Sequence, residues 1–163
     1  FKEQVVVQNQ MTNLTILKPG HQAYVRVALA FTDFLAKYGY PPGELAGVHT
    51  IHFARWVLLD GGRYLLFQGN FDGSWENYMG DFVDKIAWGL DAIWGSTIGY
   101  PSAGMRDIDA FKRYIRERQF IPQATYSAYP MQTVLNIVRS FEVCGPLSAR
   151  FDLDSTRRWL QLL

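Results

Sequence analysis

Apolar residues gather in two short runs on either side of a glycine pair, in the middle of the chain. The runs are residues 51–59 (IHFARWVLL) and 64–67 (YLLF), and the sequence DGGR separates them. Gly-Gly between runs of this kind predicts a β-hairpin, because both central residues of a type I′ turn need a positive φ. We therefore expect a strand, a two-residue turn and a second strand, followed by a helix capped by Ser74 or Asp72.

The alternation of side chains along this hairpin predicts two different sheet faces. With Gly61 and Gly62 as the loop, the cross-strand pairs are Leu58–Leu65, Trp56–Phe67, Arg55–Gln68 and Phe53–Asn70. The first face is nearly all apolar and suits a covering layer of helices; its residues are His52, Ala54, Trp56, Leu58, Leu65, Phe67 and Phe71. The second face is apolar with polar groups at one end; its residues are Phe53, Arg55, Val57, Leu66, Gln68 and Asn70. A buried arginine needs polar partners, so we expect Arg55 to meet Gln68 or Asn70.

The rest of the chain predicts two further strands and four helices, from periods of 2 and 3.6 residues and from caps and breakers. The expected strands are residues 4–17 and 120–129, and the expected helices are residues 21–38, 74–94, 107–119 and 131–143. The first helix carries a long apolar stripe, made of Tyr24, Val27, Phe31, Phe34, Leu35 and Tyr38. It has other apolar residues on its remaining sides, so more than one of its faces can be covered.

This order of elements predicts an α+β fold of the ferredoxin-like βαββαβ type. Such a domain has a four-stranded antiparallel sheet with helices on one face only. The other sheet face must be covered or used, and a second sheet of the same kind covers it in a two-module α+β barrel. We expect a single domain with a core at about residues 4–143 and an apolar C-terminal tail, residues 144–163, that docks on this chain or on a partner.

Composition narrows the class of protein. The chain has 163 residues, of which 48% are hydrophobic and 19% are charged, which is typical of one globular domain. A net charge of +1 argues against a dedicated nucleic-acid binder, and a single cysteine excludes an intrachain disulfide and a cysteine-rich metal site. No apolar run approaches the roughly 20 residues of a membrane span, and no signal peptide is visible. We therefore expect a cytoplasmic protein that does not cross a membrane.

The most specific stretch of the sequence lies within residues 51–82. Together with ATYSAYP, the stretch IHFARWVLLDGG…LLFQGNFDGSWENYMGDF resembles a group of uncharacterised bacterial proteins that carry an H-F-x-R-W/F strand and an N-F/Y-D-G turn. This group is similar to the dye-decolourising peroxidases and to the wider dimeric α+β barrel superfamily. The resemblance extends over most of residues 4–143, and it implies a haem-dependent, peroxidase-like oxidoreductase.

Residues 69–73, GNFDG, match the G-x-x-D-G motif of the dye-decolourising peroxidases, whose aspartate lies on the distal side of haem. The resemblance implies that Asp72 is the acid and base that moves the peroxide proton, and that Arg55 stabilises developing negative charge. It also makes His52 a candidate axial ligand. Further candidates for residues around the cofactor are Asn70, Gln68 and Phe53.

The chain departs from the peroxidase pattern in three ways. Ser74-Trp75 replaces the Q-P that usually follows the motif, and the sequence does not identify a proximal histidine. Those peroxidases join two ferredoxin-like modules in one chain, whereas this chain has room for one. The second module would be a second copy of this chain or another ferredoxin-like module.

Each candidate also has a purely structural explanation. The Asp72-Gly73 pair is an ordinary turn and helix entry. His52 at a strand end needs only one hydrogen-bond partner, and Arg55 can pair with Asp81 or Asp84. No H-x-H, H-E-x-x-H or carboxylate cluster points to a protein-bound metal. The alternative to the peroxidase hypothesis is therefore a non-catalytic half of a barrel that binds an apolar ligand or serves as an assembly subunit.

Overall fold

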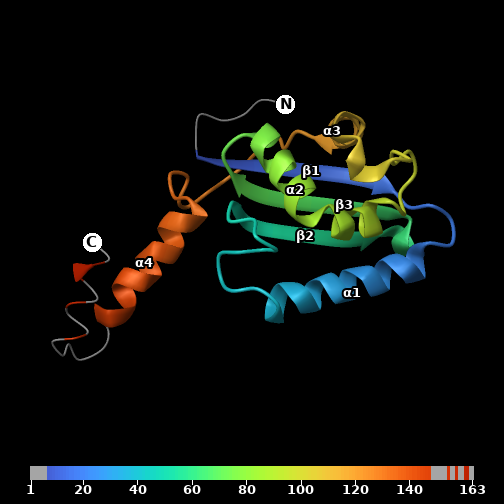
Figure 1. Cartoon of the computed structure of the whole chain (residues 1–163). Coiled ribbons are helices and arrows are strands. Elements are labelled where there is room, and N and C mark those ends of the chain that lie inside the picture. Colours follow the sequence, from blue (N-terminus) through green and yellow to red (C-terminus); the bar gives the residue numbers. More distant parts are fainter. Residues whose placement is uncertain (1–6, 148–153, 155–156, 158–159, 162–163) are drawn as a thin grey trace.

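The chain folds around one four-stranded antiparallel sheet with strand order β2-β3-β1-β4 (Figure 1). The computed structural model describes residues 7–147, 154, 157, 160 and 161. Its strands are β1 (Gln8–Ile16), β2 (Ile51–Leu59), β3 (Tyr64–Asp72) and β4 (Gln119–Phe120). Because β3 lies between β1 and β2, the helix after β1 joins two parallel strands that are not neighbours. This is the ferredoxin-like α+β arrangement that the sequence predicts.

The hairpin of β2 and β3 has the predicted register over most of its length. Leu58 pairs with Leu65, Trp56 with Phe67 and Arg55 with Gln68. The turn itself differs from the prediction, because residues 60–63 all lie outside the ladder and contain a 3₁₀ turn, η1 (Asp60–Gly62). The φ angles at residues 60, 61 and 62 are all positive, at 49°, 64° and 98°. Extending a two-residue loop by one residue on each side leaves the register unchanged, so the strand pairing was predictable although the turn was not.

A β-bulge breaks the pairing near the start of β2. Ile51 lies opposite Phe71 and Phe53 lies opposite Asn70, so His52 has no partner across the ladder. Unbroken pairing would have put His52 opposite Phe71, on the face that the helices cover. The extra residue instead frees the imidazole to reach the end of β3.

Helices α2 (Trp75–Trp94) and α3 (Ile108–Glu117) cover one face of the sheet, and the 3₁₀ turn η2 (Gly104–Arg106) lies between them in the chain. Helix α2 is capped as the sequence predicts, since Ser74 Oγ accepts from the N–H of Asn77. Asp107 caps α3 in the same way, since its Oδ1 accepts from the N–H of Ala110. The core between these helices and the sheet is strongly aromatic. It includes Phe67, Phe71, Trp75, Tyr78, Phe82, Trp94, Phe111 and Tyr114.

The opposite sheet face is largely uncovered, and we refer to it as the open face. It consists of Gln10, Thr12, Leu14, Ile16, Phe53, Arg55, Val57, Leu59, Tyr64, Leu66, Gln68 and Asn70. Phe53 is 74% exposed, and Ile16, Val57 and Leu59 are exposed as well. The segment after β4 crosses one end of this face, where Gln8 bonds to Ser127, to the carbonyl of Tyr129 and to that of Gln132.

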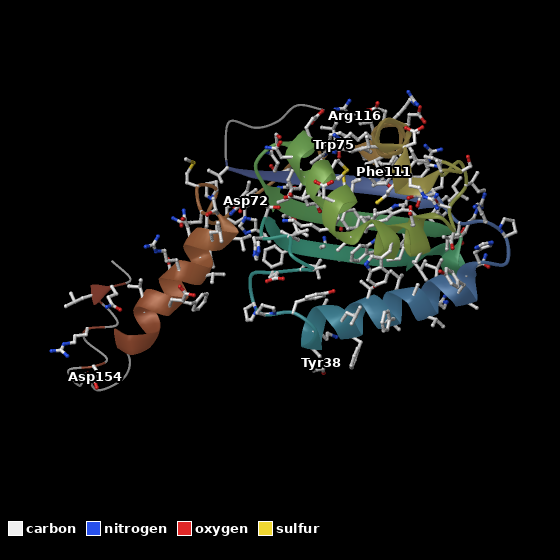
Figure 2. The ribbon with its side chains drawn as sticks, in the orientation of Figure 1. Tyr38, Asp72, Trp75, Phe111, Arg116 and Asp154 are labelled. Carbon is white, nitrogen blue, oxygen red and sulfur yellow. The ribbon has the colours of Figure 1, made fainter. Side chains whose placement is uncertain are left out.

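Helix α1 (Gln22–Tyr38) does not pack against the core through the apolar stripe that the sequence predicts, but through a different face. Val25 is fully buried, and Ala28 and Leu29 pack against the core. Most of the predicted stripe faces solvent: the exposed fractions are 53% for Tyr24, 70% for Val27, 54% for Phe31, 56% for Phe34 and 76% for Tyr38. In Figure 2 the side chain of Tyr38 points away from the sheet.

The C-terminal part of the fold departs most from the sequence prediction. The strand expected over residues 120–129 is reduced to β4, which pairs only with Thr12 and Asn13. Pro122 has no N–H to donate to a ladder, and the following residues run across Gln8 instead. Helix α4 (Val134–Leu147) begins later than expected, because Thr133 Oγ1 accepts the N–H of Asn136 and caps it. Figure 1 shows α4 extending away from the sheet.

No helix in the described part of the chain is long and apolar enough to cross a membrane. The predicted docking tail, residues 144–163, lies mostly outside the described residues.

The face assignment can be tested with two phenylalanine truncations. Phe71→Ala removes a fully buried ring and should lower the free energy of unfolding by about 3–5 kcal/mol. Phe141→Ala, at a ring of α4 that is 75% exposed, should change it by no more than about 0.5 kcal/mol. Urea unfolding followed by circular dichroism measures both values. Similar losses in the two variants would contradict the described core.

Candidate functional site

The carboxylate of Asp72, at the end of β3, joins the sheet to α4. His52 Nε2 donates to Oδ1 at 2.7 Å, and the N–H of Val134 donates to Oδ2 at 2.8 Å. The side chains of His52 and Asp72 are only 6% and 10% exposed. Figure 2 shows Asp72 beside the first turn of α4. Both carboxylate oxygens are therefore engaged, one by a strand and one by a helix.

This geometry has a clear electrostatic basis. Val134 is the first residue of α4, and the N-terminal end of a helix attracts negative charge. A nearly buried carboxylate is costly unless hydrogen bonds satisfy it, and two charge-assisted bonds do so here. The β-bulge at His52 supplies one of these bonds, and the late start of α4 supplies the other. The arrangement holds the first turn of α4 against the sheet.

The other residues of the GNFDG motif have structural roles too. Tyr78 lies over Gly69, where a Cβ would be 3.0 Å from its hydroxyl oxygen. Its ring stacks on Phe71 with a centroid separation of 3.9 Å. Gly73 has a φ of +77°, which favours glycine, and it leads directly into the cap of α2. Burial raises the pKa of Tyr78 far above its usual range, so its hydroxyl stays protonated.

Arg55 and its predicted neighbours lie elsewhere, on the open face. Arg55 Nε donates to Gln68 Oε1 at 2.7 Å, and Phe53 lies opposite Asn70 across the hairpin. Arg55 is exposed, and it bonds to the side-chain amide of Gln68 and not to Asp81 or Asp84. Gln68 and Asp72 are four residues apart on β3, which corresponds to about 13 Å along a strand. The structure thus forms two separate pairs, His52–Asp72 and Arg55–Gln68.

The surroundings of Asp72 are poorly suited to a haem. His52 Nε2 is held by Asp72, His21 Nδ1 lies 3.2 Å from Ser96 Oγ, and the third histidine, His49, is exposed. The hollow beside Asp72 is also lined by Glu76, Asp81 and Asp84, which would repel the propionates of haem. In the part of the chain that the structure describes, no group of three or more His, Cys, Asp and Glu side chains is placed to hold a metal ion.

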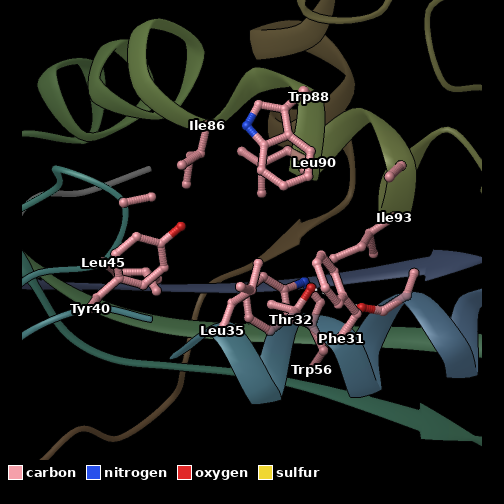
Figure 3. Close-up of a pocket in the computed structure, with 14 residues that line it drawn as sticks. Phe31, Thr32, Leu35, Tyr40, Leu45, Trp56, Ile86, Trp88, Leu90 and Ile93 are labelled. Carbon is pink, nitrogen blue, oxygen red and sulfur yellow. Dashed lines mark hydrogen bonds between the residues drawn. The ribbon is translucent and has the colours of Figure 1, made fainter. Parts of the chain in front are cut away.

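The sequence analysis missed a cavity between α1, β2 and α2. Its volume is about 100 Å³, and its lining is almost entirely apolar (Figure 3). Three distant segments form it, so no local pattern predicts it.

Comparison with known proteins adds no relative to this picture. No protein family matches the chain, and neither curated proteins nor solved structures give a match.

The role of Asp72 as a link can be tested by removing its carboxylate. Asp72→Ala leaves the buried His52 Nε2–H and the Val134 N–H without acceptors, and should lower the free energy of unfolding by about 1–3 kcal/mol. The amide of Val134 should exchange with solvent faster, as measured by hydrogen exchange and NMR. Asp84→Ala, at an exposed carboxylate of α2, serves as control and should change neither quantity. Unchanged exchange at Val134 in Asp72→Ala would contradict the link.

Proposed function

We propose that the chain is a non-catalytic ferredoxin-like module that pairs with a second copy of itself through the open face, forming a two-sheet α+β barrel. The observation that carries the proposal is the exposure of the open face, on which Phe53 is 74% exposed. Monomeric proteins rarely expose large contiguous apolar patches, and such patches usually mark interaction sites. The function is therefore assembly.

The composition of the open face supports a sheet as the partner. Arg55 is the single charged residue of this face, and its Nε is already bonded to Gln68. Depletion of charge is typical of interface cores. Two sheets pack face to face at about 10 Å, with side chains of the inner faces interdigitated. A two-fold axis would bring the same rows of residues together from both copies, as in most homodimers.

The opposite side of the molecule is a weaker candidate for the same contact. The exposed stripe of α1 is a single helical row, whereas the open face extends over three paired strands. A row of side chains on one helix buries less area than a sheet face does, and stable interfaces need about 800 Å² from each partner.

Two matched substitutions distinguish these surfaces. Phe53→Glu puts a charge on the most exposed apolar ring of the proposed interface and should raise the dimer dissociation constant by roughly 30-fold or more, since aromatic anchors of an interface contribute about 2 kcal/mol or more. Phe34→Glu makes the same change on α1, at a ring that is 56% exposed, and should leave the dimer intact. Light scattering after size-exclusion chromatography measures the mass. A monomeric wild-type chain, or a dimer broken only by Phe34→Glu, would contradict the proposal.

The haem-dependent peroxidase activity implied by the resemblance stays a prediction. We expect purified protein mixed with hemin to give no sharp, stoichiometric Soret band, because three further carboxylates line the hollow beside Asp72 and would repel the propionates of haem. A visible absorbance spectrum, recorded before and after addition of hemin, checks this expectation. A sharp Soret band that His52→Ala abolishes would favour the peroxidase hypothesis instead.

A further inference from the structure

The open face has an apolar half and a polar half, and burial of apolar surface between two copies does not account for the polar half. We propose that the assembled pair of chains binds a small carboxylate with an apolar group, such as benzoate, beside Arg55 of each copy. This inference rests on the proposed function, because the site lies between the two sheets. It is carried by a positive charge that the open face does not neutralise.

The ladder pairing sorts the side chains of the open face into four rows that run across β2, β3 and β1. Two neighbouring rows are apolar apart from one tyrosine hydroxyl: Val57–Leu66–Leu14 and Leu59–Tyr64–Ile16. The other two rows carry the polar groups: Arg55–Gln68–Thr12 and Phe53–Asn70–Gln10. Polar groups buried against the apolar rows would lose their hydration without gaining partners. The two copies should therefore bring their polar halves together, at the same end of the barrel.

This arrangement determines the direction of the two-fold axis. An axis that keeps both polar halves at one end runs along the strands, close to β3, and it exchanges the positions of β2 and β1. Arg55 of one copy then lies over the β1 side of the other copy, near Thr12 and Gln10. The two arginines are separated by about two strand spacings, roughly 10 Å, so each one needs its own anion.

The guanidinium of Arg55 lacks a carboxylate partner. Within the described part of the chain its side chain forms one hydrogen bond, from Nε to Gln68 Oε1 at 2.7 Å, and no ion pair. The open face contains neither Asp nor Glu. The carboxylate of Asp72, farther along β3, is held by His52 and by the N–H of Val134. Closing the barrel would bury a guanidinium whose terminal nitrogens have no acceptor, which is costly unless an anion accompanies it.

Neutral groups around Arg55 can donate to the same anion. Gln68 Oε1 accepts from Arg55, so Gln68 Nε2 is left as a donor. The hydroxyl of Thr12 and the side-chain amide of Gln10 from the second copy would add further donors. The planar fork of a guanidinium matches the two oxygens of a carboxylate, so a carboxylate fits this set of donors.

The neighbours of Arg55 along β2 favour a carboxylate with an apolar group. Phe53 and Val57 lie on the same face, two residues to either side, and are 74% and 38% exposed. A ring attached to the carboxylate could contact them and leave water. Facing sheets lie only about 10 Å apart, so the apolar group is limited to about one ring. The segment that bonds to Gln8 crosses the face beyond the polar rows and would shield the ligand from solvent.

Benzoate and benzamide test the proposal on the full chain, since they have nearly the same shape and only benzoate is charged. Calorimetry should show one benzoate bound per chain, and benzamide should bind at least tenfold more weakly, since hydrogen bonds to charged groups are the stronger ones. At ten times its own dissociation constant, benzoate should lower the dimer dissociation constant about 100-fold, which is tenfold for each of two sites. Inorganic phosphate, an oxyanion without an apolar group, should bind more weakly than benzoate.

Two arginine substitutions that remove the same charge locate the site. Arg55→Gln should bind benzoate and benzamide equally weakly, and benzoate should no longer tighten its dimer, which forms without burying a charge. Arg113→Gln, at an exposed position of α3, should bind benzoate as the wild type does. Both side chains are exposed in the single chain, so neither substitution should unfold it.

The outcomes separate this proposal from the proposed assembly. Three results would overturn the carboxylate site and leave the assembly standing: a dimer that dissociates in Phe53→Glu but binds no benzoate in the wild type, benzoate binding that Arg55→Gln leaves unchanged or that Arg113→Gln weakens equally, or tighter binding of phosphate than of benzoate. A chain that is monomeric both with and without benzoate would overturn the assembly and the site together.

Discussion

The stacking of Tyr78 on Phe71 determines how α2 lies across the sheet. The two rings are nearly parallel, with an interplanar angle of 6°, and the hydroxyl of Tyr78 lies so close to Gly69 that a Cβ there would be only 3.0 Å away. From that contact α2 continues along the sheet to Trp94, whose ring meets Phe67 at 5.2 Å. The buried apolar residues of α2 thus all lie on one side of β3. No helix in the described part of the chain covers the other side of the same strand, and the exposed apolar rows follow from this constraint.

The sequence predicted those parts of the fold that depend on interactions between residues close together in the chain. The hairpin register follows from alternation and a central loop, and the starts of α2 and α3 follow from Ser74 and Asp107. The orientation of α1 could not be predicted, because the helix has apolar residues on several sides and only its tertiary neighbours choose among them. Likewise, the segment after Phe120 has the composition of a strand, but Pro122 and the hydrogen bonds of Gln8 give it a different course.

The sequence identified residues of the candidate site but not the hydrogen bonds that join them. Asp72 and His52 stood out in the sequence, yet their hydrogen bond depends on a β-bulge that no periodicity reveals. The partner on α4, Val134, lies 62 residues from Asp72 in the chain. The residues of a motif that resembles a catalytic one thus have structural explanations here. Gly69 leaves room for the hydroxyl of Tyr78, and Phe71 stacks on the ring of Tyr78. Gly73 adopts a positive φ, and Asp72 bonds to the first residue of α4. The cavity under α1 was missed for the same reason, since it exists only where three distant segments meet.

The order of the strands has a consequence for folding. β2 and β3 are joined by four residues, whereas Asn13 of β1 pairs with Phe67, 54 positions along the chain (67 − 13). Short loops close with less loss of entropy than long ones, so we expect the hairpin to form early and β1 to add to its edge late. Phe53 and Val57 belong to this early hairpin, so the apolar rows of β2 exist before the central strand is in place. During synthesis, the chain would therefore expose apolar surface to other nascent chains before its hydrophobic core has formed.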